Sequence, residues 1–127
     1  MGTKLLTVED SPEIRDEITS CLSDEGYIVV TAEDGLMGWE KIHEQPDIEM
    51  IILDQNMPRM QGLQLAEKIR TELKSEVPIV MLTTESSPEF REKGKELGIK
   101  YWIVKPFEGS RMLKLAEKIT GGAAPQP

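Results

Sequence analysis

Met50-Ile51-Ile52-Leu53-Asp54, residues 50–54, is an apolar run that ends abruptly in a carboxylate. A strand that is apolar at every position, without polar alternation, is typical of a parallel sheet that helices cover on both faces. We therefore expect this run to be the central strand of an α/β sheet. Asp54 would then lie at the carboxyl end of that strand.

Three other apolar runs also end in polar side chains: Leu5-Leu6-Thr7-Val8 before Glu9-Asp10, Ile79-Val80-Met81-Leu82 before Thr83, and Trp102-Ile103-Val104 before Lys105. Segments with helical spacing separate the runs, and this alternation predicts parallel strands. The carboxyl ends of parallel strands meet at one edge of the sheet, where open α/β sheets bind their ligands. We expect three carboxylates, a hydroxyl and an ammonium to share that edge.

The chemistry of this cluster points to phosphoryl transfer. Three crowded carboxylates raise each other's pKa unless a cation lies between them, and Mg²⁺ is the hard divalent ion that prefers oxygen ligands. The hydroxyl of Thr83 and the ammonium of Lys105 suit the oxygens of a phosphoryl group. Asp54 is a plausible nucleophile because a carboxylate can form an acyl phosphate. The predicted cofactor is therefore Mg²⁺.

At these positions the chain resembles the receiver domain of bacterial two-component response regulators. The signature positions of that family are matched in order by Glu9-Asp10, Asp54, Thr83 and Lys105-Pro106-Phe107, and residues 57–62 resemble its loop after the phosphorylated aspartate. The resemblance spans residues 3 to 120. It implies a three-layer, doubly wound α/β fold of the flavodoxin-like type, with a five-stranded parallel sheet in the order 2-1-3-4-5.

The resemblance also implies the reaction and the partners. Asp54 would accept a phosphoryl group from a histidine kinase or a phosphotransfer domain, and Thr83 and Lys105 would bind that group. The domain would catalyse only its own phosphorylation and dephosphorylation, so we do not expect an enzyme in the ordinary sense. A downstream protein target would bind the modified domain.

The same resemblance implies a metal site. Asp10, Asp54 and the backbone carbonyl of Asn56 would hold Mg²⁺. Glu9 stands where the family usually has aspartate, and its extra methylene favours a contact with the metal through water.

The resemblance also implies a conformational switch that couples Thr83 to Trp102. Movement of Thr83 toward the phosphoryl group would free space for Trp102, where the family mostly has a smaller aromatic residue. The target would bind the face made by the fourth helix, the fifth strand and the fifth helix, which includes Phe90, Lys95 and Trp102. A static, partly buried Trp102 is the alternative.

Three variable positions are expected to tune the lifetime of the phosphoryl group. Asn56 and Glu85 look like the pair found in chemotaxis regulators, which favours a fast messenger. Thr84 is bulkier than the residue often found beside the phosphoryl-binding hydroxyl, and it would narrow access to Asp54. If these side chains are only solvated loop residues, they have no such effect.

Composition sets limits on the whole chain. Its 127 residues suffice for one domain, which we place at residues 1–120, with a flexible tail at 121–127. A net charge of −8 argues against direct binding of nucleic acid. There is one cysteine and no apolar run of membrane-spanning length, so we expect a cytoplasmic protein without membrane contact. It would be mainly a monomer, with dimerisation left open.

Local signals predict five strands and five helices. We expect strands at about residues 4–8, 27–31, 50–53, 79–82 and 100–104. Ser11-Pro12, Asp34-Gly35 and Ser87-Pro88 are expected to begin helices. The second helix would turn Leu36, Trp39 and Ile42 inward.

Two other classes of protein compete with a free-standing regulator. The first is a receiver excised from a hybrid kinase or a transcription factor, with residues 121–127 as linker. The second is an aspartyl-phosphate phosphatase, although such enzymes expect a second aspartate two residues after the nucleophile, where this chain has Asn56. A receiver-like domain that binds partners without being phosphorylated is a weaker third alternative.

Overall fold

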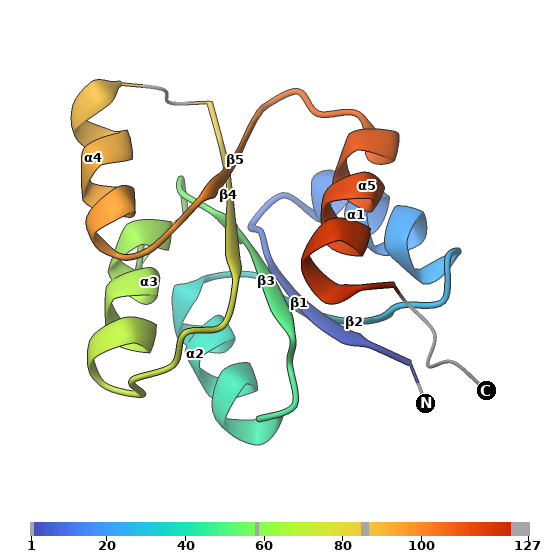
Figure 1. The fold of residues 1–127 in the computed structure, drawn as a ribbon, viewed down its shortest axis with the longest axis horizontal. Coiled ribbons are helices and arrows are strands. Elements are labelled where there is room, and N and C mark those ends of the chain that lie inside the picture. The colour runs from blue at the N-terminus through green and yellow to red at the C-terminus, as the bar shows by residue number, and fades with distance from the viewer. Residues whose placement is uncertain (1, 58, 85–86, 123–127) are drawn as a thin grey trace.

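The computed structural model describes residues 2–57, 59–84 and 87–122. Strands and helices alternate along the chain (Figure 1): β1 (Lys4–Val8), α1 (Pro12–Ser23), β2 (Ile28–Ala32), α2 (Gly35–Glu44), β3 (Met50–Asp54), α3 (Gly62–Thr71), β4 (Ile79–Thr83), α4 (Pro88–Glu96), β5 (Tyr101–Val104) and α5 (Gly109–Thr120). The expected element types and their order are confirmed. The predictions for Glu85, Pro58 and residues 123–127 lie outside the described residues.

The five strands form one parallel sheet in the order β2-β1-β3-β4-β5, as expected. The register pairs Val8 with Leu53, Asp54 with Leu82, and Thr83 with Val104. These pairs bring the ends of four strands to the same level. The sheet therefore places the polar residues that follow β1 and β5 next to those that end β3 and β4.

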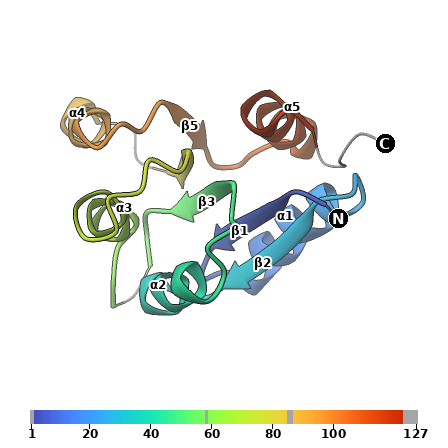
Figure 2. The same cartoon turned by 60° about the horizontal axis from the view of Figure 1, so that its bottom comes forward.

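Helices cover both faces of the sheet and give three layers. One core cluster joins the sheet to α2, α3 and α4, and the other joins it to α1 and α5. Figure 2 shows the two groups of helices on opposite sides of the strands. Every residue of β3 is buried and β3 is the middle strand of the five, which confirms that it is central; its neighbour β4 is also buried throughout.

Three helices begin at the residues that the sequence indicates. Ser11 and Ser87 cap α1 and α4, and Asp34 caps α2 by accepting a 2.9 Å hydrogen bond from the Met37 N–H. A proline follows each of the two serines at the first helical position, where its missing N–H costs nothing. These caps orient each helix as it leaves the strand before it.

Some details differ from the predictions. β2 begins at Ile28 and ends at Ala32, one residue later than expected, because the Tyr27 N–H bonds the Leu22 carbonyl and its side chain packs in the core. Leu36 is 42% exposed and does not point inward, whereas Trp39 and Ile42 pack against the core. Met37, the next residue of α2, packs against the core, and successive helical residues point in directions about 100° apart, so Leu36 lies on the outer side of the helix.

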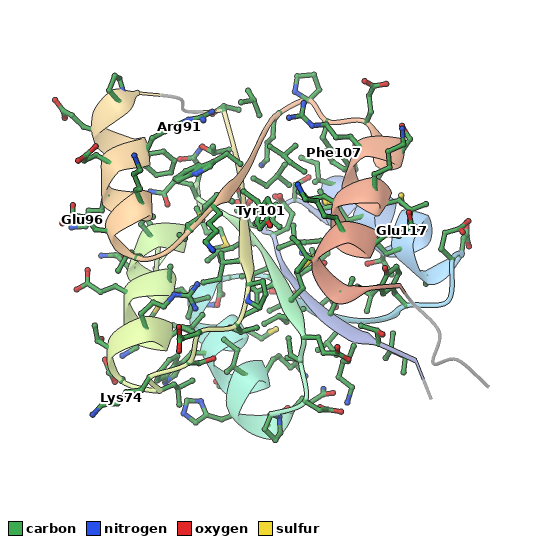
Figure 3. All side chains as sticks on the ribbon, viewed as in Figure 1. Lys74, Arg91, Glu96, Tyr101, Phe107 and Glu117 are labelled. Atoms are coloured by element: carbon green, nitrogen blue, oxygen red, sulfur yellow. The ribbon has the colours of Figure 1, made fainter. Side chains whose placement is uncertain are left out.

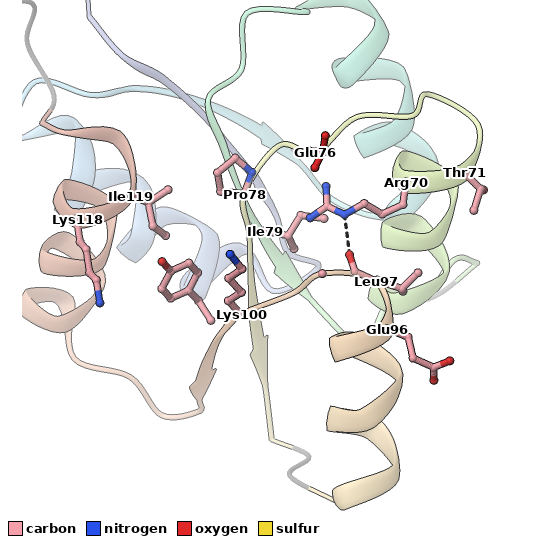
Figure 4. A pocket seen from close by; sticks show the side chains of 12 residues that line it. Arg70, Thr71, Glu76, Pro78, Ile79, Glu96, Leu97, Lys100, Lys118 and Ile119 are labelled. Carbon is pink, nitrogen blue, oxygen red and sulfur yellow. Dashed lines mark hydrogen bonds between the residues drawn. The ribbon is translucent and has the colours of Figure 1, made fainter.

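Arg70 lies at the end of the sheet opposite to the predicted site, near the amino ends of β4 and β5, and bonds the segments that precede these strands. Its guanidinium donates to the Leu97 carbonyl at 2.7 Å (Figure 4) and to the carbonyls of Ser75 and Val77 at 2.9 and 2.8 Å. These bonds fasten the end of α3 to the end of α4 and to the segment before β4. An open hollow of about 640 Å³ adjoins Arg70, far from the carboxylates at the other edge.

Candidate functional site

The site is built from residues at the carboxyl ends of four strands. Asp54 and Thr83 are the last residues of β3 and β4, and Glu9 and Lys105 follow β1 and β5. Hydrogen bonds continue the sheet past these ends: the Glu9 N–H bonds the Ala32 carbonyl at 3.0 Å, and the Lys105 N–H bonds the Thr83 carbonyl at 2.9 Å. Backbone pairing therefore holds the four side chains in place.

Lys105 lies between two buried carboxylates. Its Nζ is 3.0 Å from Asp54 Oδ1 and 3.3 Å from Glu9 Oε1. Glu9 and Asp54 are both fully buried, so the single ammonium offsets two charges that water cannot reach. The pairing of Lys105 with Glu9 was not foreseen from the sequence, because nothing local links the two residues.

Burial changes the protonation of this group. Desolvation raises the pKa of Glu9 to about 7, while the hydrogen bond from the Ser11 N–H opposes that rise and the charge of Asp54 adds to it. Desolvation also raises the pKa of Asp54, against the hydrogen bond and charge of Lys105. Burial alone would lower the pKa of Lys105, but the hydrogen bond and charge of Asp54, together with Glu9, raise it. Without a further cation, burial therefore disfavours the charged forms of Glu9 and Asp54.

The carboxylates fit a divalent cation. One oxygen from each of Glu9, Asp10 and Asp54 lies within 4.8 Å of the others. Within the described part of the chain, the buried oxygen Asp54 Oδ2 has no hydrogen-bond partner, and Glu9 Oε1 has only the 3.3 Å ion pair with Lys105. Asp10 is exposed and faces the solvent from which an ion would enter. A hard ion with oxygen ligands would satisfy these oxygens, so the donor set agrees with the expected Mg²⁺.

The loop after β3 is shaped by contacts to Asp54 and Gln55. A Cβ at Gly62 would lie 2.5 Å from the Asp54 carbonyl, so only glycine allows α3 to begin so close to β3. Gln55 is buried; its Oε1 accepts a 2.8 Å hydrogen bond from the Leu63 N–H, and its Nε2 donates to Gln61 Oε1. The role of Gln55 was missed because a glutamine between two candidate ligands resembles an ordinary loop residue.

The expected tuning residues surround the same edge. The Asn56 N–H donates to Asp54 Oδ1 at 3.3 Å, and the Asn56 side chain donates to Thr84 Oγ1 at 3.3 Å. Asn56 and Thr84 are both exposed beside the buried carboxylate. Their linkage places two of the three predicted tuning positions in one contact, while Glu85 falls outside the described residues.

The family of the chain is decided by comparison. A family model described as the response regulator receiver domain matches residues 5–117. The chain belongs to this receiver family. Chemotaxis protein CheY1 of Helicobacter pylori is 38% identical over 120 residues, which cover 93% of this chain and 97% of that protein.

Solved structures agree with this assignment. The chemotaxis response regulator CheY4 of Vibrio cholerae superposes with a TM-score of 0.84 and 38% identity, over 94% of this chain and 99% of that one. A chain in the CheX-CheY-BeF3-Mg complex from Borrelia burgdorferi has a TM-score of 0.84 and 26% identity, over 92% of this receiver and 88% of that chain. The receiver is therefore a signalling domain similar to the CheY regulators.

The sequence was expected to contain no membrane-spanning segment. No helix among the described residues is long and apolar enough to cross a membrane.

Phe90, predicted to form part of the exposed output face, is only 7% exposed, and that prediction was wrong. Phe90 lies on the side of α4 that faces the sheet, beneath the surface that Trp102 and Lys95 border.

Proposed function

We propose that this receiver is a cytoplasmic messenger that a histidine kinase or a phosphotransfer domain phosphorylates on Asp54. The observation that carries the proposal is that Asp54 is buried while only one of its two carboxylate oxygens has a partner among the described residues. Asp54 is buried at the end of the central strand β3, with one oxygen held by Lys105 and the other without a donor among the described residues. A structural ion pair would need both oxygens satisfied, whereas an acceptor of a charged group needs one oxygen available.

The residues present account for the transfer. An oxygen of Asp54 attacks phosphorus, so a P–O bond forms while the P–N bond of the donor breaks, and the departing imidazole nitrogen takes a proton from solvent. Lys105 Nζ would bind the new phosphoryl oxygens, which its 3.0 Å contact with Asp54 Oδ1 supports, and Thr83 lies at the end of the neighbouring strand. Burial excludes bulk water, which strengthens both interactions.

We assign the metal-holding role to Asp10, Asp54 and the Asn56 carbonyl, with Glu9 acting through water. Mg²⁺ bound there would supply positive charge to offset the carboxylates and the phosphoryl oxygens. The burial of Glu9 and its pairing with Lys105 support an indirect role, because that carboxylate already has a cationic neighbour. Asp10 is the exposed member of the cluster and the more accessible ligand.

The output would leave through the face between α4 and α5, with Trp102 as the residue that moves. Two shallow hollows adjoin Trp102 on this face, and Figure 3 labels Arg91 and Tyr101 there. One carboxylate, Glu92, and six cations line them: Arg91, Lys95, Lys100, Arg111, Lys114 and Lys118. In a chain of net charge −8, this concentration of positive charge favours a target segment that carries carboxylates.

Phosphorylation of the purified protein tests the proposal. Acetyl phosphate or phosphoramidate with Mg²⁺ should add one hydroxylamine-labile phosphate, and Asp54→Asn should remove the labelling. Asp10→Asn keeps Asp54 and is the matched control, which should label more slowly at the same residue. Label on another residue would contradict the assignment. Steady turnover of a phosphomonoester would instead favour the phosphatase alternative.

A further inference from the structure

The indole of Trp102 packs against α4. Its ring meets Phe90 edge to face, with centroids 5.1 Å apart and planes at 72°, and the Arg91 guanidinium lies 5.4 Å from the indole centroid. Trp102 is half-buried and joins the core cluster on the α4 side of the sheet. Ring contacts and a cation over the face both stabilise this arrangement.

Gly94 makes room for that arrangement. A Cβ built at position 94 would lie 2.5 Å from Cη2 of the Trp102 indole and closer still to Cζ2. Carbon atoms without a bond between them do not approach so closely. The six-membered ring of the indole therefore occupies the volume that any side chain at position 94 would need.

The backbone at Gly94 is not free to retreat. Its carbonyl accepts hydrogen bonds from the N–H groups of Leu97 and Ile99 at 3.0 and 2.9 Å, and Gly98, with φ of 75°, donates to the Lys95 carbonyl at 3.0 Å. The bond from Ile99 to Gly94 and the bond from Gly98 to Lys95 together form the Schellman motif, which fixes the last turn of α4. An added side chain would therefore displace the indole rather than the helix.

We propose that Gly94 is a positioning residue that admits the Trp102 indole to α4 and so sets the balance between its packed and outward arrangements. This inference rests on the proposed switching role of Trp102 and adds the element that controls it. The alternative explanation is that Gly94 is a neutral helix position. That alternative predicts the opposite effect of alanine on stability, since alanine favours a helix more than glycine does.

The first measurement follows the indole directly. In a Trp39→Phe background Trp102 is the only tryptophan. Gly94→Ala should shift its emission to longer wavelength and raise the acrylamide quenching constant about two-fold, because the displaced ring meets water. Lys93→Ala, at an exposed position of the same turn and outside the hollows beside Trp102, is the matched control and should leave both unchanged. Unchanged emission and quenching in Gly94→Ala would overturn the inference.

The second measurement is a double-mutant cycle with Trp102→Phe, since a phenyl ring lacks Cζ2 and Cη2. In the Trp102→Phe background, Gly94→Ala should raise Tm by about 4 °C through helix propensity. With Trp102 present the same change should lower Tm. A Gly94→Ala protein that folds only together with Trp102→Phe shows the same coupling in its extreme form. Equal Tm changes in the two backgrounds would refute it.

Beryllofluoride with Mg²⁺ separates this inference from the proposed function. If the mimic changes the Trp102 emission of the parent while Gly94→Ala equals the parent in both measurements, the inference on Gly94 fails and the switch stands. If the bound mimic leaves the parent emission unchanged while Gly94→Ala exposes the indole, Gly94 still positions Trp102, but phosphorylation does not move it.

Discussion

Lys105 Nζ lies 3.0 Å from Asp54 Oδ1, and this contact joins the end of β5 to the end of the central strand β3. The same ammonium is 3.3 Å from Glu9 Oε1. A positive charge shared by two buried carboxylates links the stability of the domain to the state of its reactive group. Changes in metal, pH or phosphorylation should therefore be detectable in unfolding experiments as well as in activity.

Replacing Lys105 tests that link. Lys105→Met should lower the free energy of unfolding by about 3 kcal/mol at pH 8 without Mg²⁺, because two buried carboxylates lose their cation. The loss should be smaller at pH 5, where Glu9, whose pKa is raised to about 7, takes up a proton and one of the two negative charges disappears. Urea denaturation measures it, and Lys100→Met, which removes an exposed ammonium, is the control. Equal stability of the Lys105 variant and the parent at pH 8 would contradict the role of the pair.

The raised pKa of Glu9 gives a pH dependence with a definite sign. The folded value is about 7 against an ordinary 4.5, so the native state binds more protons than the unfolded state between these values. Metal-free stability should therefore fall as pH rises from about 4.5 to 7, by at most about 3 kcal/mol relative to Glu9→Gln. Denaturation in EDTA across this range measures the difference. A parent that becomes more stable relative to Glu9→Gln as pH rises from about 4.5 to 7 would show that the sign is wrong.

The apolar runs made most of the fold predictable. A run such as residues 50–54 signals a covered strand by itself, and the polar residue that follows each run marks its carboxyl end. Asp54, Thr83 and Lys105 could therefore be assigned to one edge from the order of residues alone. The strand order came from the family resemblance, since periodicity does not say which strands are neighbours.

Contacts between distant segments could not be predicted. The ion pair of Lys105 with Glu9 and the packing of Trp102 against Gly94 depend on how helices and strands dock. Phe90 was misplaced for the same reason: an exposed and a buried position of α4 differ only by the rotation of the helix on the sheet. The rotation of a helix on a sheet is determined by how their side chains pack, and the pattern of apolar residues in one sequence gives little information about that packing.

The metal prediction concerns Asp10. Asp10→Asn should weaken Mg²⁺ binding at least about ten-fold, or about 1.4 kcal/mol, because a charged oxygen ligand is lost from the cluster. The fold should persist, since Asp10 is exposed. Isothermal titration with MgCl₂ measures the affinity. Asp16→Asn, an equal change of charge on the exposed side of α1, should leave it within about two-fold of the parent. Equal binding by the two variants would remove Asp10 from the ligand set.

Arg70 should affect stability without affecting the reaction. Burial lowers the pKa of its guanidinium, with the charge of Glu76 opposing, and the group donates to three backbone carbonyls at the edge opposite Asp54. Arg70→Met keeps the apolar stem but leaves those carbonyls to the water of the adjoining hollow. The free energy of unfolding should fall by about 2 kcal/mol, and Arg70→Lys should lose less because one donor remains.

Phosphorylation distinguishes a purely structural Arg70 from a coupled one. At a temperature where Arg70→Met is fully folded, its rate of labelling on Asp54 should equal that of the parent. This follows because Arg70 donates its hydrogen bonds at the end of the sheet opposite to Lys105 and the carboxylates. A folded variant that labels several-fold more slowly would show that the two edges of the sheet are energetically coupled, and the site would then extend beyond the carboxyl ends of the strands.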